Sequence, residues 1–177
     1  MPVILNRALR AAALDPYVYD ELSPRGQAMG QAVAIIILSG VAAGIGDARS
    51  GGIAAFLIGT VAALAGWFLW TLVAYFAGTR MFPGRRTTSG YVRMLTFAGF
   101  ASAPGLIRVL ELLPGLRAPV FLAAAVWMIA ATIIGIKQSL RYSSTLKAAG
   151  ICITAWLVQV GATGAVIYAL RAYAGFV

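Results

Sequence analysis

Five long apolar runs constrain the fold of this chain more than any other feature of its sequence. Each is close to or longer than the roughly 20 residues that a helix needs to cross the hydrocarbon core of a membrane. Backbone polar groups find no water there, so a spanning segment has to satisfy them within its own helix or in a closed barrel. We therefore predict an all-α integral membrane bundle of five transmembrane helices, with spans at about residues 27–46, 53–78, 94–113, 118–136 and 148–170.

The composition leaves room for little besides this membrane domain. Hydrophobic residues make up 61% of the 177 residues and charged residues only 11%, whereas a soluble domain has about 25% charged residues. We assign residues 27–177 to the five-span domain and residues 1–26 to a cytoplasmic or interfacial N-terminal segment. In that segment Val3–Leu14 has the pattern of a short amphipathic helix, and Tyr17–Leu22 has aromatic side chains suited to the headgroup layer.

Basic residues outside the spans predict the orientation. Cytoplasmic loops of membrane proteins are enriched in Lys and Arg, and the two sides of this chain differ strongly. The side formed by the N-terminal segment and the second and fourth loops carries Arg7, Arg10, Arg25, Arg80, Arg85, Arg86, Arg93, Lys137, Arg141 and Lys147. The other side carries Arg49, Arg117 and Arg171. We predict a cytoplasmic N-terminus and an external C-terminus, and we attribute the net charge of +9 to lipid contacts rather than to nucleic-acid binding.

The third apolar run is unusual because it contains a proline and two opposite charges. With α-helical spacing Pro104, Arg108 and Glu111 share one face, and the two charged residues are close enough in sequence to pair. Together with Gln159 of the fifth run, these residues form a candidate intramembrane polar site. Two interpretations stay open: a structural pair beside a packing kink at Pro104, or a proton or ion relay along a broken helix.

Rows of small residues predict close helix packing. Gly30 and Ala34 are four residues apart in the first run, and Ala98, Ala101 and Gly105 line one face of the third. Such rows let helix backbones approach where lipid supplies no hydrophobic drive. We expect packing within one bundle, with homodimerisation through one of these rows as the alternative.

A second candidate site is the predicted cytoplasmic surface, where aromatic and basic residues concentrate. Tyrosine and arginine are enriched in protein interfaces. We expect this surface to contact another protein through Tyr17, Tyr19, Arg80, Arg85, Arg86 and Arg93. Charge and aromatic content define the surface, and no motif adds to them.

The residue inventory argues against catalysis. The chain has no histidine, and its single cysteine, Cys152, lies within the fifth apolar run. One chain therefore cannot build a disulfide, a histidine-containing zinc site or a histidine-ligated haem. The sequence also shows no activated nucleophile and no phosphate-binding glycine loop. We expect a protein that is not an enzyme and that has no cofactor and no metal.

Two stretches resemble one known family. FAGFASAPGLI at Phe97–Ile107 and VWMIAATIIGIKQSLRYSSTLKAAG at Val126–Gly150 are similar to the Yip-domain family of five-span membrane proteins, and the resemblance covers roughly Gln27–Leu170. Eukaryotic members of that family interact with Rab-type small GTPases and act in vesicle traffic. Their long N-terminal region and their Asp-Leu-Tyr-Gly-Pro-type motif are missing before Gln27. The resemblance therefore implies the small bacterial branch and a bacterial inner-membrane location, and Rab binding is not carried over.

We interpret the sequence as that of a non-enzymatic membrane scaffold or adaptor with a membrane-organising role. Its expected partners are the lipid bilayer and either another membrane protein or a second copy of the chain, with no nucleic acid. The alternative is a small membrane carrier or channel component with a polar path near Arg108 and Glu111. The two interpretations differ in whether these core charges or the loop arginines matter for function.

Overall fold

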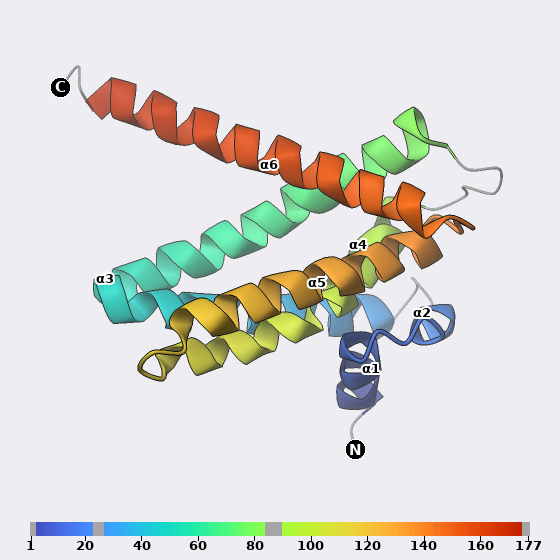
Figure 1. The fold of residues 1–177 in the computed structure, drawn as a ribbon, viewed down its shortest axis with the longest axis horizontal. Coiled ribbons are helices and arrows are strands. Elements are labelled where there is room, and N and C mark those ends of the chain that lie inside the picture. Colours follow the sequence, from blue (N-terminus) through green and yellow to red (C-terminus); the bar gives the residue numbers. More distant parts are fainter. Residues whose placement is uncertain (1–2, 23–26, 84–89, 175–177) are drawn as a thin grey trace.

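A computed structural model describes residues 3–22, 27–83 and 90–174 of the chain. Helices, turns and coil account for these three ranges, and no strand occurs in them, which confirms the all-α prediction. The elements, drawn in Figure 1, are α1 (Val3–Ala12), α2 (Val18–Glu21), α3 (Gln27–Phe76), the π-helix η1 (Ala77–Met81), α4 (Tyr91–Ala101), the 3-10 helix η2 (Ala103–Leu112), α5 (Arg117–Ser139) and α6 (Thr145–Ala174).

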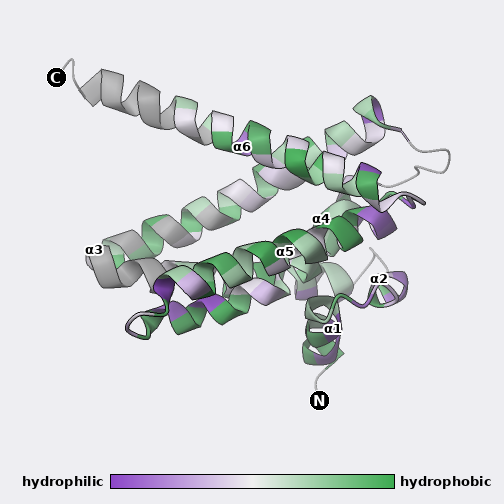
Figure 2. Ribbon diagram, in the orientation of Figure 1, coloured by the Kyte–Doolittle hydropathy of each residue, from purple (hydrophilic) through white to green (hydrophobic). Residues whose placement is uncertain are grey.

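Five helical segments are long and apolar enough to cross a membrane, as the sequence predicts. They are Gln27–Ile45, Gly52–Met81, Tyr91–Leu112, Arg117–Ser139 and Thr145–Ala162. Figure 2 shows that these segments are mainly apolar and that strongly hydrophilic positions gather near helix ends and in α1 and α2. This distribution is the one that a bundle surrounded by lipid requires.

α3 reverses direction at Gly52 and so supplies two of the five spans. Gly52 has a φ of 64° and a ψ of −155°, a conformation that glycine adopts readily and other residues rarely adopt. Beyond this residue the chain runs back along the first helix. The two helices are in close contact near the turn, where a side chain at Gly44 would meet Thr60 and Phe56. Figure 1 shows the resulting hairpin, with α6 crossing its second helix.

α4 is the central helix of the bundle. Every residue from 94 to 101 is buried, and α4 packs against α1, α3 and α5. Phe97 and Phe100 belong to a hydrophobic cluster shared with α1, α2 and the first helix of α3, while Met94 belongs to a second cluster shared with α5, α6 and the end of α3. α4 therefore joins the two halves of the core.

The third span changes helix type at Pro104. Proline has no N–H to donate and its ring clashes with the preceding turn, so the α-helix ends at Ala101. The Ser102 hydroxyl donates a hydrogen bond to the Ala98 carbonyl oxygen (3.0 Å), and the chain continues as the 10-residue 3-10 helix η2. A 3-10 helix rises about 2.0 Å per residue against 1.5 Å for an α-helix, so η2 reaches about 5 Å further than an α-helix of its length. The kink expected at Pro104 is thus a change of helix type.

α1 is confirmed as an amphipathic helix, and it packs against the sides of the spans. Ala8 and Ala11 are buried in the cluster that also holds Phe97, whereas Leu5 and Leu9 are exposed. α1 contacts α4, η2 and α5, and Figure 1 shows it at one side of the bundle, below these helices. The small alanine face of α1 permits this close contact, and Ile4 packs against the same cluster.

Two long-range hydrogen bonds hold α1 in place. Arg7 Nη1 donates to Gln31 Oε1 (3.0 Å) on α3, and Trp127 Nε1 donates to the carbonyl oxygen of Ala12 (2.6 Å). Trp127 lies 12 positions before Ser139, the last residue of α5, which corresponds to about 18 Å along the helix. The C-terminal end of α1 therefore reaches the middle of the fourth span.

Candidate functional site

The charged pair of the third span forms as the sequence predicts. Arg108 Nε lies 2.7 Å from Glu111 Oε1, and the side chains of Arg108 and Glu111 are 21% and 1% exposed. In a 3-10 helix, residues three apart lie directly above one another, so η2 aligns the pair better than an α-helix would. The Arg108 guanidinium also lies over the ring of Phe121 on α5, 5.3 Å from the ring centroid.

A recess of about 380 Å³ opens beside this pair, between the end of η2 and the start of α5. Its walls are Arg108, Glu111, Arg117, Ala118 and Phe121. Ala118 and Phe121 are exposed on the surface of the bundle, so the recess can be reached from outside. Two cations and one carboxylate thus face a space that is otherwise apolar.

The other members of the predicted polar path lie elsewhere. Pro104 is buried where η2 begins and does not line the recess. Gln159 on α6 has its amide nitrogen against Gly66 of α3, where an added side chain would meet it. Of the four residues proposed as an intramembrane polar site, the structure brings together only Arg108 and Glu111.

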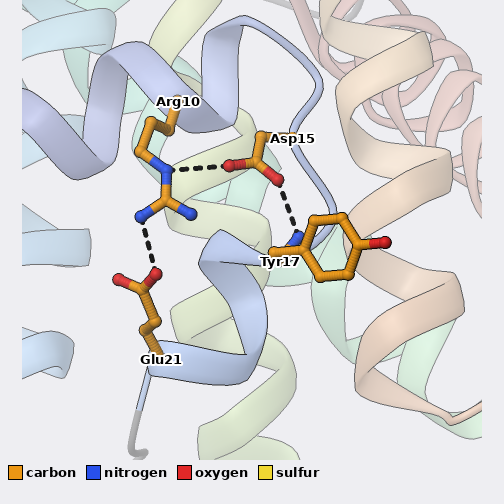
Figure 3. A network of polar contacts seen from close by, with 4 residues as sticks. All are labelled: Arg10, Asp15, Tyr17 and Glu21. Carbon is orange, nitrogen blue, oxygen red and sulfur yellow. Dashed lines mark hydrogen bonds and ion pairs between the residues drawn. The ribbon is translucent and has the colours of Figure 1, made fainter.

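The second candidate site begins with the N-terminal platform, by which we mean residues 3–22: α1, α2 and the turn between them. Arg10 joins its parts, because its Nε lies 2.7 Å from Asp15 Oδ2 and its Nη1 lies 2.6 Å from Glu21 Oε1. Asp15 Oδ1 in turn accepts a hydrogen bond from the backbone N–H of Tyr17 (2.9 Å). Figure 3 shows this network of four residues. The platform is therefore tied together by charge-assisted hydrogen bonds.

The electrostatics of the platform follow from these contacts. The hydrogen bond from Arg10 lowers the pKa of Asp15 below its usual value of 3.8, and the Tyr17 N–H lowers it further. The same two carboxylates raise the pKa of Arg10, with Glu21 the larger cause. Each shift favours the charged form, so the hydrogen bond between Arg10 and Asp15 joins two charged groups at neutral pH.

The two tyrosines predicted as contact residues have opposite environments. Tyr17 is 72% exposed, whereas Tyr19 is 1% exposed and its ring packs on Phe97 with centroids 5.1 Å apart. The prediction that Tyr19 lies on a contact surface is therefore corrected. Tyr19 is a core residue because α2 turns that face toward α4 and Gly135 of α5.

Burial leaves the Tyr19 hydroxyl without a hydrogen-bond partner among the described residues and shifts its pKa. Removal from water raises the pKa of this phenol above its usual value of 10.0, because the charged form is poorly solvated in the core.

The predicted contact arginines fall into three groups. Arg80 is exposed on η1. Arg93 is partly buried, and its guanidinium lies 5.0 Å from the centroid of the Phe97 ring. Arg85 and Arg86 lie outside the described residues. Among the described residues, Tyr17 and Arg80 therefore remain as exposed members of the predicted surface.

Several important residues carry no recognisable signal in the sequence. The hydrogen bond between Trp127 and Ala12 joins residues 115 positions apart, and Arg10 reaches Asp15 and Glu21 across a turn without helical register. Phe121 and Arg117 are four residues apart on one helix, a spacing that does place them on one face. That spacing could have marked them as neighbours of the turn after Glu111.

Comparison with known proteins gives one match. The family model described as the Yip1 domain matches residues 18–167. The matched region begins at α2 and reaches into α6, so it includes the candidate residues of both sites except those that precede residue 18, Tyr17 among them. No curated protein and no solved structure matches the chain.

Proposed function

The chain belongs to the Yip1 domain family, and from that premise we propose that it is a non-enzymatic scaffold or adaptor that binds another membrane protein. The observation that carries this proposal is the N-terminal platform, in which Arg10 holds Asp15 and Glu21 while Tyr17 stays exposed. A binding surface that is ordered before the partner arrives loses less conformational entropy on association. The platform has this property.

The chemistry of the exposed platform residues suits a protein partner. Tyr17 offers an aromatic body with a polar tip, the combination found most often at interface anchor positions. Asp20 and Glu21 lie beside it and are also exposed, which supplies a polar rim of the kind that surrounds such anchors. Arg80 on η1 adds a cation that a partner can contact.

We propose that the platform faces the cytoplasm of a bacterial cell and that the bundle crosses the inner membrane. The distribution of basic residues supports this orientation, since the N-terminal segment and the second and fourth loops are rich in Lys and Arg. Five crossings then place the C-terminus outside. The same distribution supports contact with anionic lipid on the cytoplasmic side.

The proposal includes no catalytic step, no cofactor and no nucleic acid. A carrier function along Arg108, Glu111 and Gln159 has less support, because Gln159 lies against Gly66 and away from the recess. Self-association through the platform remains a form of the adaptor proposal, and the experiment below distinguishes it from binding of a different protein.

Affinity purification after crosslinking in native membranes tests the proposal. Wild type is expected to bring down a protein at a reproducible ratio, identified by mass spectrometry. Tyr17→Ala should reduce that yield severalfold, because it removes the aromatic anchor without touching the Arg10 network, whose Tyr17 contact is a backbone N–H.

Leu122→Ala is the matched control, since Leu122 is an exposed apolar residue on α5, and it should leave the yield unchanged. A yield that is equal in wild type and Tyr17→Ala would contradict the platform as the contact surface. Recovery of the chain's own copies alone would identify the partner as a second copy of the chain.

A further inference from the structure

The recess at the end of the third span has no role in the proposed adaptor function. It lies where η2 ends and α5 begins, and it is lined by Arg108, Glu111, Arg117, Ala118 and Phe121. The platform contacts of Arg10, Glu21 and Tyr17 involve none of these residues. We therefore ask which ligand, separate from the adaptor's protein partner, this recess could bind.

The charges of the recess favour an anion. The carboxylate of Glu111 is buried, and Nε of Arg108 lies 2.7 Å from its Oε1. The negative charge of Glu111 is therefore balanced by Arg108. A guanidinium carries five N–H donors, and the ion pair with Glu111 uses only the Nε of Arg108. Arg117 adds a second cation to the wall. The three charges sum to +1.

The shape of the recess favours an anion that carries apolar chains. Phe121 supports the Arg108 guanidinium at 5.3 Å and is itself 49% exposed. The next residue, Leu122, is also exposed on the surface of α5. Val126 and Ile129 follow Leu122 at helical spacing and are exposed as well. An apolar strip thus leads away from the two arginines along the outside of α5, where a membrane protein meets acyl chains.

The position of the recess matches the headgroup layer. Arg117 is the first residue of α5, and the turn before it joins two membrane spans. Arginines at this level place their guanidinium groups among lipid phosphates, with which they form bidentate hydrogen bonds. Basic pockets between spanning helices are a known form of anionic lipid site.

We propose that this recess binds the phosphate of an anionic phospholipid headgroup between Arg108 and Arg117, with the acyl chains along Phe121 and Leu122. Glu111 orients the Arg108 guanidinium toward the phosphate. This site is independent of the adaptor surface, because it uses different residues.

Native mass spectrometry of the full chain, purified in detergent, tests the proposal with phosphatidylglycerol and phosphatidylcholine as the probe lipids. Wild type is expected to retain phosphatidylglycerol more tightly than phosphatidylcholine. Arg117→Gln should weaken phosphatidylglycerol binding about fivefold, the effect of removing one basic residue near a lipid phosphate. Leu146→Gln is the control and should leave the binding of both lipids unchanged, because Leu146 is exposed at the start of α6 and lies outside the recess.

Two further variants protect the test against a folding defect. Arg117→Lys keeps the charge and is expected to keep most of the preference for phosphatidylglycerol. The double variant Arg108→Gln/Glu111→Gln removes both charges of the pair, leaves no buried carboxylate unpaired, and should also weaken phosphatidylglycerol binding.

The outcomes separate the possible sources of the phosphate. Loss of the phosphatidylglycerol preference in Arg117→Gln and in the double variant would support the lipid site. Equal retention of the two lipids by wild type, or equal phosphatidylglycerol binding by wild type and Arg117→Gln, would overturn it. Displacement of phosphatidylglycerol by an excess of inorganic phosphate would assign the recess to a soluble anion and would overturn the lipid assignment.

Discussion

Arg108 and Glu111 form an ion pair of 2.7 Å on a 3-10 helix, and the helix type is what aligns them. The turn of three residues puts one side chain directly above the other. Pro104 ends the preceding α-helix, so a residue without charge determines how two charged residues meet further along the span. The pair in turn closes one wall of the recess.

Removal of one member of this pair should destabilise the bundle. Arg108→Leu leaves the Glu111 carboxylate buried and unpaired, and we expect it to lower the free energy of unfolding by about 3 kcal/mol. The double variant Arg108→Leu/Glu111→Leu should be close to wild type, because no unpaired charge remains in the core. Unfolding by sodium dodecyl sulfate in mixed micelles measures both free energies.

If the double variant is as unstable as Arg108→Leu alone, the ion pair stabilises the bundle by more than the cost of burying its two charges. The same double variant also tests the carrier alternative. Under the adaptor proposal it should retain the crosslinked partner.

Two substitutions of Tyr19 should change the stability of the bundle by very different amounts. Tyr19→Phe removes an oxygen that has no hydrogen-bond partner among the described residues, so stability should stay the same or rise by about 1 kcal/mol. Tyr19→Ala removes the whole ring from its contact with Phe97 and should cost about 3 kcal/mol or more. Unfolding in mixed micelles compares the two. A large loss in Tyr19→Phe would mean that the hydroxyl has a partner outside the described residues.

We expect the stability of the platform to fall in acid, because Asp15 stabilises it only in its charged form. Its folded-state pKa is lowered by Arg10 and by the Tyr17 N–H, so its stabilising contribution is complete above the usual value of 3.8 and is lost as the pH falls below that value. Thermal unfolding of wild type and Asp15→Asn from pH 7 downward checks this sign. The two proteins should differ near neutral pH and converge in acid. A difference that grows as the pH falls would contradict the assigned role of Asp15.

The close approach of α3 and α4 depends on Gly99. A Cβ at Gly99 would lie 2.7 Å from Cβ of Ala32 and 3.1 Å from its carbonyl oxygen, so Gly99→Ala has to push two packed helices apart. We expect a loss of about 1–3 kcal/mol in the free energy of unfolding. Gly30→Ala is the matched control, because nothing lies within 4 Å of a Cβ there, and it should be neutral or stabilising by up to about 1 kcal/mol. Equal effects of the two substitutions would argue against tight packing at Gly99.

The two glycines also show what sequence reasoning can and cannot do. Rows of small residues predicted close packing in the first and third runs, and Gly105 does face Ser39 and Met128 closely. Gly30 belongs to such a row and faces open space, while Gly99 lies outside the row and makes a close contact. Spacing identifies residues that share a helix face, but it does not say which face meets a neighbour.

The spans themselves were predictable because length and hydropathy depend only on local sequence. Their predicted and observed bounds agree within a few residues for the first four spans. The contact between Arg108 and Glu111 was predictable for the same reason, since both residues lie on one short segment. Contacts between distant segments were not predictable: Trp127 with Ala12, and Gln159 against Gly66. These contacts depend on how whole helices are rotated and placed.

The measurement that tests the adaptor proposal most directly is site-specific photo-crosslinking in living cells, with a photoreactive amino acid at position 17 or at position 122. Both side chains are exposed, but only Tyr17 belongs to the N-terminal platform. The proposal predicts a discrete protein adduct at position 17 and lipid adducts alone at position 122. A chain that forms no protein adduct at position 17, or that forms the same adducts at both positions, would contradict it.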